Sequence, residues 1–274
     1  MGKFYSINGE IMEAEHAKLH VSDLSILRGF GVFDFFRTSK GKLLFIEDYL
    51  ARFRNSTNTF NFSHDYSDEF IKDHVLKLIE LNGYDEPSVK LIMTGGYSHN
   101  GFEPTTPNLI IQIEPLKFPA KHYYTDGAKL ITHKYVREFP EVKSTNYLTA
   151  IMLSGKCKSE NALDVLYHDG EIVSEVTRSN FFIVKDRKII TAKTGILKGV
   201  TRGKVLGVAK GYYEVEEREL GVNELETADE AFITSTNKKV MPITQIDNYK
   251  IYNGNVGEVT KHLMALFFEL EEAQ

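Results

Sequence analysis

The sequence predicts a mixed α/β (α+β) protein built from two domains. Hydrophobic residues form 42% and charged residues 26% of its 274 residues, which is ordinary for a globular chain with room for two cores. Strand and helix patterns alternate in the first part, and strands with inserted helices dominate after the proline-containing segment PLKFPAKHYYTDG. We therefore expect a small α/β domain at residues 1–116, a linker at 117–124 and a large domain at 125–274.

The small domain is expected to be an α/β sandwich. Its first two strands flank the turn signal Asn8-Gly9 in FYSINGEIMEAE, and two more strands should meet at Ser39-Lys40-Gly41. Two helices follow, one over IEDYLARFRNSTNTF, whose apolar residues recur at helical spacing, and one capped by Ser67 and ended by Gly83. The stretches VKLIMTGG and NLIIQIEPL complete the domain as strands.

The large domain is expected to be β-rich and barrel-like, with helices added. Two hairpins are predicted, one turning at Asp169-Gly170 in DVLYHDGEIVSE and one at Asp186-Arg187 in NFFIVKDRKIITA. The run VTRGKVLGVAKGY predicts a helix, EAFITST a strand, and GEVTKHLMALFFELEE a closing amphipathic helix.

Charge and composition argue against several classes of protein. The net charge is −5 and Lys and Arg are spread along the chain, so we expect no nucleic-acid partner. The lone cysteine, Cys157, cannot form an internal disulfide, and a cytoplasmic location is the simplest expectation. The N-terminus turns polar and acidic before a signal-peptide core forms, and no window approaches 18 apolar residues, so no membrane association is expected.

Three kinds of chemistry lack their motifs. His16 and His20 have i,i+4 spacing, but HExxH and partner cysteines are missing, so no metal site is expected. There is no GxSxG motif of a serine hydrolase. In GILKGVTRGKV, Val205 stands where a phosphate-binding P-loop requires Ser or Thr.

Four features could carry chemistry, although each has an ordinary explanation when taken alone. Lys143, in FPEVKSTNY, precedes a predicted helix, and such a lysine is usually a surface charge. Arg52 and Glu175 would be solvated side chains of a helix and a strand. The segment Gly199-Val200-Thr201 opens a helix, whose free N–H groups and positive dipole end suit a phosphate.

Together, six stretches resemble the class IV pyridoxal-phosphate aminotransferases, in the order and spacing of that family. This family includes D-amino acid aminotransferases, branched-chain aminotransferases and aminodeoxychorismate lyases. The resemblance implies a two-domain fold type IV enzyme that uses pyridoxal 5′-phosphate. The matching stretches are SDLSILRGFGVFDFFRT, FIEDYLARF, VKSTNYLTAI, GEIVSEVTRSNFF, GILKGVTRGKV and ITSTNKKVMPI.

The resemblance implies roles for residues that would meet the cofactor. Lys143 matches the lysine that bonds covalently to the cofactor aldehyde and then moves a proton at the substrate Cα. Glu175 matches the carboxylate that keeps the pyridine nitrogen protonated. Asn180 is expected to brace the strand that carries Glu175. The residues implied to hold the phosphate or the phenolic oxygen are Arg52, Val200, Thr201, Thr236 and Tyr147.

Recognition of the substrate departs from the family pattern. D-amino acid aminotransferases use an Arg-x-His pair in a loop after a TRG-like strand end. Here MTGGYSHNGFEP has Gly95 in place of the arginine of TRG, and Asn100 and Phe102 stand near the positions of the pair, so the usual carboxylate site is missing. We expect Arg28, with Lys90, to bind the substrate carboxylate, and the alternative for Arg28 is a salt bridge to Asp23 or Asp34. Two further substrate candidates are the apolar Phe33 and the polar Arg37.

The expected activity is exchange of amino groups between amino acids and 2-keto acids by a ping-pong mechanism. Both a D-amino acid enzyme and a branched-chain enzyme remain open, and the alternative is an aminodeoxychorismate lyase that releases pyruvate and p-aminobenzoate. The resemblance also implies a homodimer.

Overall fold

The computed structural model describes residues 2–274 and divides into two compact units. The first unit combines the residues up to Lys117 with Val142–Tyr147. The second unit combines Phe118–Glu141 with Leu148–Gln274. The short segment Val142–Tyr147 therefore packs with the first unit, although 24 residues of the second unit (118–141) separate it from Lys117 in the chain.

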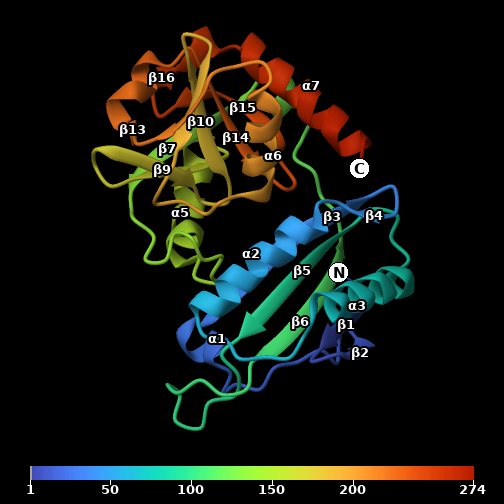
Figure 1. Cartoon of the computed structure of the whole chain (residues 1–274). Helices are drawn as coiled ribbons and strands as arrows, with labels where there is room; N and C mark the ends of the chain where they lie inside the picture. Colours follow the sequence, from blue (N-terminus) through green and yellow to red (C-terminus); the bar gives the residue numbers. More distant parts are fainter. Residues whose placement is uncertain (1) are drawn as a thin grey trace. The chain divides into compact units, whose positions relative to one another are not determined.

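The first unit is a six-stranded antiparallel sheet with two long helices, as the alternating sequence pattern predicts (Figure 1). The strand order is β2-β1-β6-β5-β3-β4. Its strands are β1 (Phe4–Ile7), β2 (Glu10–Glu13), β3 (Gly31–Ser39), β4 (Lys42–Leu43), β5 (Pro87–Thr94) and β6 (Asn108–Pro115), and its helices are α1 (Leu24–Arg28), α2 (Ile46–Thr59) and α3 (Asp68–Asn82).

Local signals determine the ends of these elements. Asn8 and Gly9 have positive φ values of 54° and 88°, which the tight turn between β1 and β2 requires. Ser67 caps α3 by accepting a hydrogen bond from the Phe70 N–H, and Gly83 ends it at a left-handed φ of 67°. The expected strand after Gly41 is shorter than predicted, because Phe45 takes a φ of 52° and starts α2.

Helices α2 and α3 cover one face of this sheet, where α2 contacts β3 and α3 contacts β1 and β6 (Figure 1). Strand residues on this face are fully buried, as the period of two in a strand requires: examples are Val32, Asp34 and Phe36 on β3. The alternate residues, such as Phe33, Phe35 and Lys90, stay half-buried on the opposite face. The sheet therefore has one face free of these helices.

The second unit is built on ten strands. The main path runs β12-β11-β10-β14-β15-β7-β8-β9-β13, and β16 pairs with β15. Its strands are β7 (Ala128–Lys134), β8 (Asp164–His168), β9 (Ile172–Val176), β10 (Asn180–Lys185), β11 (Lys188–Ala192), β12 (Val215–Arg218), β13 (Leu220–Gly221), β14 (Glu230–Ser235), β15 (Lys239–Ile246) and β16 (Tyr249–Lys250).

This sheet is barrel-like, as predicted, because its two ends come together. β12 and β13 are the first and last strands of the path, yet only Glu219 separates them in the chain. The interior is a continuous apolar core that includes Leu166, Phe181, Ile233 and Met241. The helices of this unit are α4 (His122–Thr125), α5 (Leu148–Ser159), α6 (Val200–Ala209) and α7 (Glu258–Glu272), with 3-10 turns η1 (Val222–Thr227) and η2 (Ile251–Gly254).

Two hairpin turns and two helices were predicted correctly in this unit. The Asp169 carboxylate accepts the N–H groups of Glu171 and Ile172 in the β8–β9 turn. Asp186 and Arg187 have φ values of 50° and 60° in the β10–β11 turn. Helices α6 and α7 pack against each other, and both contact β14 (Figure 1).

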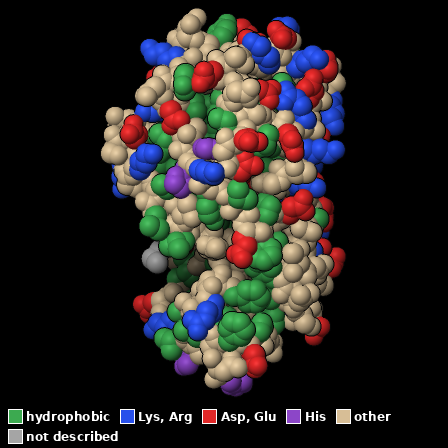
Figure 2. All heavy atoms as spheres, turned by 90° about the vertical axis from the view of Figure 1, so that its left-hand side faces the viewer, with side chains coloured by type: hydrophobic (Ala, Val, Ile, Leu, Met, Phe, Trp, Pro, Cys, Tyr) green, Lys and Arg blue, Asp and Glu red, His purple; other side chains and the backbone are tan. Residues whose placement is uncertain are grey.

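Two general features are the distribution of charge on the surface and the length and apolar character of the helices. On the face shown in Figure 2, positive and negative side chains are intermixed. Within residues 2–274, none of the helices has the length and apolar character needed to cross a bilayer.

Candidate active site

Lys143 lies in a short segment that pairs with the start of β3. The Phe33 N–H donates to the Lys143 carbonyl (2.8 Å), and the Thr145 N–H donates to the Gly31 carbonyl (2.9 Å). The Lys143 N–H donates to the Ser56 hydroxyl on α2 (3.1 Å). These three bonds hold the backbone of Lys143 against the first unit and explain why Val142–Tyr147 groups with it.

The Lys143 side chain is half-buried beside aromatic rings. Its Nζ lies 4.6 Å from the centroid of the Phe33 ring, a cation–π contact. The ring of Tyr147 packs edge-on against Phe33, with the centroids 5.7 Å apart. The structure thus brings together three residues that the sequence singled out: Lys143, Phe33 and Tyr147.

Arg52 reaches from α2 to the underside of β3, where it forms a two-point ion pair with Asp34. Its Nε and Nη2 donate to the Asp34 carboxylate at 2.9 and 2.6 Å. Burial by itself lowers the pKa of Arg52, but the charge and hydrogen bonds of Asp34 outweigh it and the pKa is raised. The guanidinium therefore stays charged. Its Nη1 has no hydrogen-bond partner among residues 2–274.

Three substrate candidates share the open face of the first sheet. In the pairing of β3 with β5, Phe33 lies opposite Ile92, Phe35 opposite Lys90, and Arg37 opposite Ser88, so their side chains project from the same face. Lys90 is half-buried and makes no ion pair with any residue from 2 to 274, whereas Arg37 is almost fully buried. This face combines an aromatic wall with cationic groups.

Arg28 ends the short helix α1 and is exposed. Its Nη1 donates to the Leu27 carbonyl at 2.9 Å, and it makes no ion pair within the described residues. The salt-bridge alternative for Arg28 is not observed, because Asp34 pairs with Arg52 and Asp23 binds other donors. Its guanidinium remains available to an anion.

Asp23 is a fully buried carboxylate that joins α1 to the sheet. Its Oδ1 accepts the backbone N–H and the hydroxyl of Ser25 (2.8 and 2.7 Å), which caps the helix that ends at Arg28. Its Oδ2 accepts the Thr94 hydroxyl (2.7 Å) and the Asn108 amide (2.8 Å) at the ends of β5 and β6. Asp23 therefore sets the position of α1, and sequence reasoning did not give it this role.

Glu175, on β9 in the second unit, is a buried carboxylate that accepts hydrogen bonds at both oxygens. Its Oε1 accepts from Nη1 of Arg137 at 2.7 Å. Its Oε2 accepts the backbone N–H of Leu197 (3.0 Å) and, more weakly, the side-chain amide of Asn180 (3.4 Å). The same amide donates to the Leu197 carbonyl at 2.7 Å, so Asn180 links the Glu175 carboxylate to the backbone of Leu197.

The N-terminus of α6 begins three residues after Leu197. Val200 and Thr201 are buried, and Gly199, the N-cap, has no side chain to satisfy the first N–H groups of the helix. A Cβ at position 199 would collide with Oδ1 of Asn180, so this approach requires glycine. These amide groups and the positive end of the helix form an anion-binding feature.

The hydroxyl of Thr234 adds a further polar group to this anion-binding feature. Thr234 on β14 lies opposite Asn180 on β10, so both side chains project from the same face. The Thr234 hydroxyl is buried without a hydrogen-bond partner among the described residues. Thr236 follows two residues later, in the turn that leads to β15.

The donor set of the second unit fits pyridoxal 5′-phosphate. Glu175 is a buried acceptor for a protonated ring nitrogen, and the N-terminus of α6 supplies donors for a phosphate. The unsatisfied hydroxyl of Thr234 marks a place where a polar ligand atom is still needed. The ring nitrogen thus has a matching carboxylate side chain, and the phosphate has matching backbone N–H groups.

Lys238 is a buried lysine that sequence reasoning missed. Its Nζ donates to the Ser179 hydroxyl (3.1 Å) and pairs with the Asp164 carboxylate (3.3 Å). Burial lowers the pKa of this amine, and Asp164 offsets part of the effect. The ion pair ties the turn that carries Thr236 to β8 and to the residue before Asn180. Nothing in the local sequence distinguishes Lys238 from an exposed lysine.

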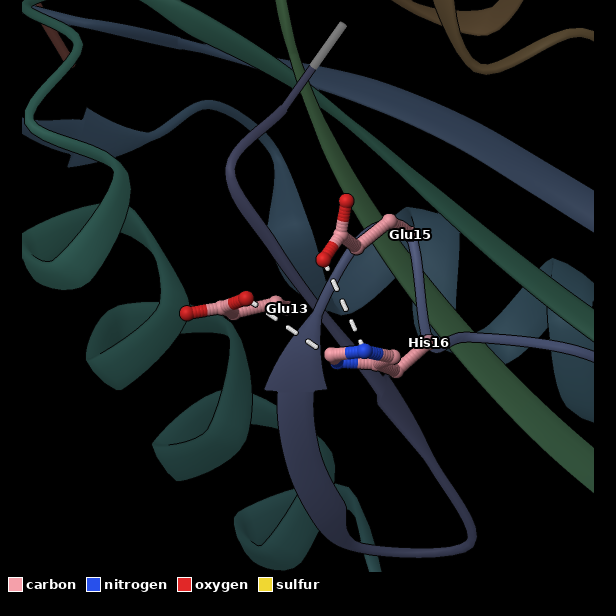
Figure 3. Close-up of side chains that lie close together, drawn as sticks. All are labelled: Glu13, Glu15 and His16. Carbon is pink, nitrogen blue, oxygen red and sulfur yellow. Dashed lines mark ion pairs between the residues drawn. The ribbon is translucent and has the colours of Figure 1, made fainter.

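The remaining titratable cluster is a surface feature. His16 lies 3.9 Å from Glu13 and 3.5 Å from Glu15, and all three side chains are exposed (Figure 3). Exposed acidic groups near a histidine are common without a bound ion, so this cluster carries no metal assignment.

Comparisons with known proteins agree with this chemistry. The family model for class IV aminotransferases (Amino-transferase class IV) matches residues 31–246. A D-alanine aminotransferase from Listeria monocytogenes is 30% identical over 96% of this chain and 94% of its own length. A putative branched-chain-amino-acid aminotransferase from Methanocaldococcus jannaschii is 31% identical over 96% and 95%.

Solved structures give the same result for the fold. The branched-chain amino acid aminotransferase of Escherichia coli superposes with a TM-score of 0.92 at 22% identity, over 99% of this chain and 95% of that one. The T.th. branched-chain amino acid aminotransferase in complex with N-(5′-phosphopyridoxyl)-L-glutamate gives 0.90 at 25% identity, over 100% and 95%. The predicted fold type IV architecture is therefore confirmed. From its match over most of its length and its donor set for the cofactor, the chain belongs to the class IV aminotransferases, which are pyridoxal-phosphate-dependent transaminases.

Proposed function

We propose that this chain exchanges amino groups between D-amino acids of the alanine class and 2-keto acids, in two half-reactions of a ping-pong mechanism. The observation that carries the chemistry is the buried Glu175 carboxylate beside the N-terminus of α6, which suits a protonated ring nitrogen and a phosphate. The 30% identity to D-alanine aminotransferase supports the substrate class.

Lys143 is the proposed catalytic residue. When bound, the cofactor supplies a ring that accepts the electron pair left on the substrate Cα. Lys143 would hold the cofactor through its aldehyde group, and the free amine of Lys143 would take the proton from the substrate Cα. The packing of Nζ against the Phe33 ring places this amine beside the aromatic wall of the sheet face.

Glu175 is proposed to hold the proton on the ring nitrogen. A carboxylate beside that nitrogen stabilises its charged form, and the Leu197 N–H fixes the orientation of Oε2. The donors assigned to the phosphate are Nη1 of Arg52, the helix N–H groups of Val200 and Thr201, and the Thr236 hydroxyl. Tyr147 is assigned to the phenolic oxygen.

The substrate carboxylate is assigned to Arg28, with Lys90 and Arg37 as further cations. Arg28 and Lys90 make no ion pair within residues 2–274, and a substrate carboxylate would neutralise their positive charge. Phe33 supplies an apolar wall on the same sheet face as Lys90. An open face lined by aromatic rings suits a short aliphatic side chain.

A branched-chain substrate is the second candidate. It is favoured by the 31% identity to the putative branched-chain-amino-acid aminotransferase and by the same aromatic wall. Both candidate activities use the same catalytic groups. Their substrates differ only in the configuration at Cα and in the size of the side chain.

A spectral titration separates these candidates. The visible band of the cofactor-loaded protein is recorded, and D-alanine, D-glutamate, L-leucine and L-glutamate are then added in separate samples. We expect D-alanine to remove the band and to yield pyruvate, and Lys143→Ala serves as the control without the covalent band. Loss of the band with L-leucine alone would assign the branched-chain class instead. A band that no amino acid changes, with p-aminobenzoate released from aminodeoxychorismate, would assign the lyase.

We also propose that the enzyme is a homodimer in the cytoplasm. Helix α5 has no buried residue and exposes Leu148, Ile151 and Met152, with exposed fractions of 65%, 68% and 74%. An apolar helix face of this kind is typical of an interface. The lone cysteine favours a reducing compartment. Sedimentation of the protein and of Ile151→Glu tests the dimer: we expect the substitution to give monomers, and a wild-type monomer would contradict the proposal.

A further inference from the structure

Arg137 contacts the carboxylate that is assigned to the ring nitrogen. Its Nη1 lies 2.7 Å from Oε1 of Glu175, and the two side chains have exposed fractions of 16% and 6%. The same nitrogen donates to the Pro140 carbonyl at 3.1 Å. Arg137 thus joins β9 to the turn that leads towards Lys143, and neither the motif stretches nor the spacing of the sequence pointed to it.

A buried carboxylate is costly unless a cation or several donors compensate its charge. When the cofactor is bound, the protonated ring nitrogen is a second cation for Glu175. Two cations then share one carboxylate, and each weakens the attraction that the other feels. The strength with which Glu175 holds the ring nitrogen therefore depends on the charge of Arg137.

We propose that Arg137 is the permanent counterion of Glu175. Arg137 compensates the negative charge of the carboxylate in the cofactor-free chain, and it weakens the interaction of that carboxylate with the cofactor's ring nitrogen. This inference rests on the role proposed above for Glu175. Arg137 is a positioning residue in this account, because it acts through Glu175.

The competing explanation is a purely structural one. Arg137 could serve only to hold the turn at Pro140, through one bond to a carbonyl and one to a carboxylate. Arg54 provides a matched comparison, because it donates to the Asp68 carboxylate and to the Tyr66 carbonyl, both at 2.6 Å. Arg54 lies in the first unit and has no proposed role in the site.

The experiment measures the contribution of the ring nitrogen to cofactor binding. Dissociation constants are determined for pyridoxal 5′-phosphate and for an analogue in which carbon replaces the ring nitrogen. The ratio of the analogue constant to the cofactor constant isolates the contact with Glu175, because losses of local order affect both ligands. The ratio is compared in the wild type, Arg137→Met, Arg137→Gln, Glu175→Gln, Arg137→Met/Glu175→Gln and Arg54→Met.

We expect the ratio to rise about fivefold or more in Arg137→Met, because the ring nitrogen no longer competes with a second cation. Arg137→Gln should raise it as well, since the amide can keep the bond to Pro140 but carries no charge. This variant keeps the test decisive if Arg137→Met folds poorly. Arg54→Met should leave the ratio at the wild-type value, and Arg137→Met should have no effect on the ratio once Glu175 is Gln.

Two results would overturn the proposal, and they are distinguishable. If Glu175→Gln lowers the ratio but neither Arg137 variant changes it, Arg137 is only a structural contact and the role of Glu175 stands. If Glu175→Gln leaves the ratio unchanged, the role proposed for Glu175 fails, and the inference about Arg137 fails with it.

Discussion

Arg52 and Asp34 form a two-point ion pair across 18 positions of the chain, with Nη2 and Oδ1 only 2.6 Å apart. The side chain of Asp34, on β3, is fully buried, and that of Arg52 is 11% exposed. This pair aims the arginine assigned to the cofactor phosphate and leaves its Nη1 for that contact.

Asp34→Asn should therefore weaken both the fold and the cofactor site. Removing one partner leaves a buried guanidinium without its anion, and we expect the free energy of unfolding to fall by about 3 kcal/mol. Urea unfolding of the cofactor-free protein measures this loss. The control is Asp68→Asn, which removes the corresponding partner of Arg54 at a more exposed site (37%). Equal losses in the two variants would show that burial of Asp34 adds nothing.

Lys143→Ala should abolish amino-group transfer while the protein stays folded. The variant lacks the amine that is proposed to hold the cofactor and to move the substrate proton, and proton transfer by a positioned group contributes about 10²–10⁴-fold to a rate. The visible band after cofactor loading and the rate of pyruvate formation are the measurements. Lys198→Ala removes an exposed lysine (69%) and should leave both unchanged. Wild-type rates in Lys143→Ala would contradict the assignment.

Arg28→Ala should raise KM for the amino acid about 10–100-fold, because a charge-assisted bond to the substrate carboxylate contributes about 1.5–3 kcal/mol. Affinity for the cofactor should stay at the wild-type value. Steady-state kinetics and a cofactor titration separate these effects. Lys77→Ala, an exposed cation on α3, is the control. An unchanged KM would remove Arg28 from the substrate site.

Asp23→Asn should also raise KM, because the amide cannot accept all four of the hydrogen bonds that position α1. If Asp23 acts through Arg28, its effect on KM should be absent when Arg28 is already Ala. The KM values of the two single variants and the double variant provide the measurement. Full additivity would mean that Asp23 acts on the site by another route.

Tyr5→Phe should change how stability depends on alkaline pH. Burial and the hydrogen bond to Glu114 raise the pKa of Tyr5 from 10.0 to about 12. The unfolded phenol therefore loses its proton first, so this stabilisation is complete below pH 10 and is lost as pH rises to about 12.

We expect the wild type to lose roughly 1–2 kcal/mol more than Tyr5→Phe between pH 9.5 and 11.5. Urea midpoints at the two pH values measure the difference. Tyr97→Phe, an exposed tyrosine (39%), should behave like the wild type. If the wild type and Tyr5→Phe lose the same free energy of unfolding between these two pH values, the raised pKa of Tyr5 is contradicted.

Local sequence was sufficient wherever a residue determines the backbone next to it. Asn8-Gly9, Ser67 and Asp169 gave the turns and caps that they predict, because positive φ values and side-chain hydrogen bonds act within a few residues. The exception, the short β4, followed from the left-handed backbone of Phe45, which no propensity predicts.

The side-chain pairs of the site were not accessible in this way. Arg52 meets Asp34 across 18 positions, Glu175 meets Arg137 across 38, and Asn108 meets Asp23 across 85. The sequence by itself determined the turns, caps and helices named above and, through ordered motif stretches, the family and the choice of Lys143, Glu175 and Arg52 as candidates. Only the tertiary structure decided which charge compensates which, because strand register and helix packing bring these partners into contact and burial makes each pairing obligatory.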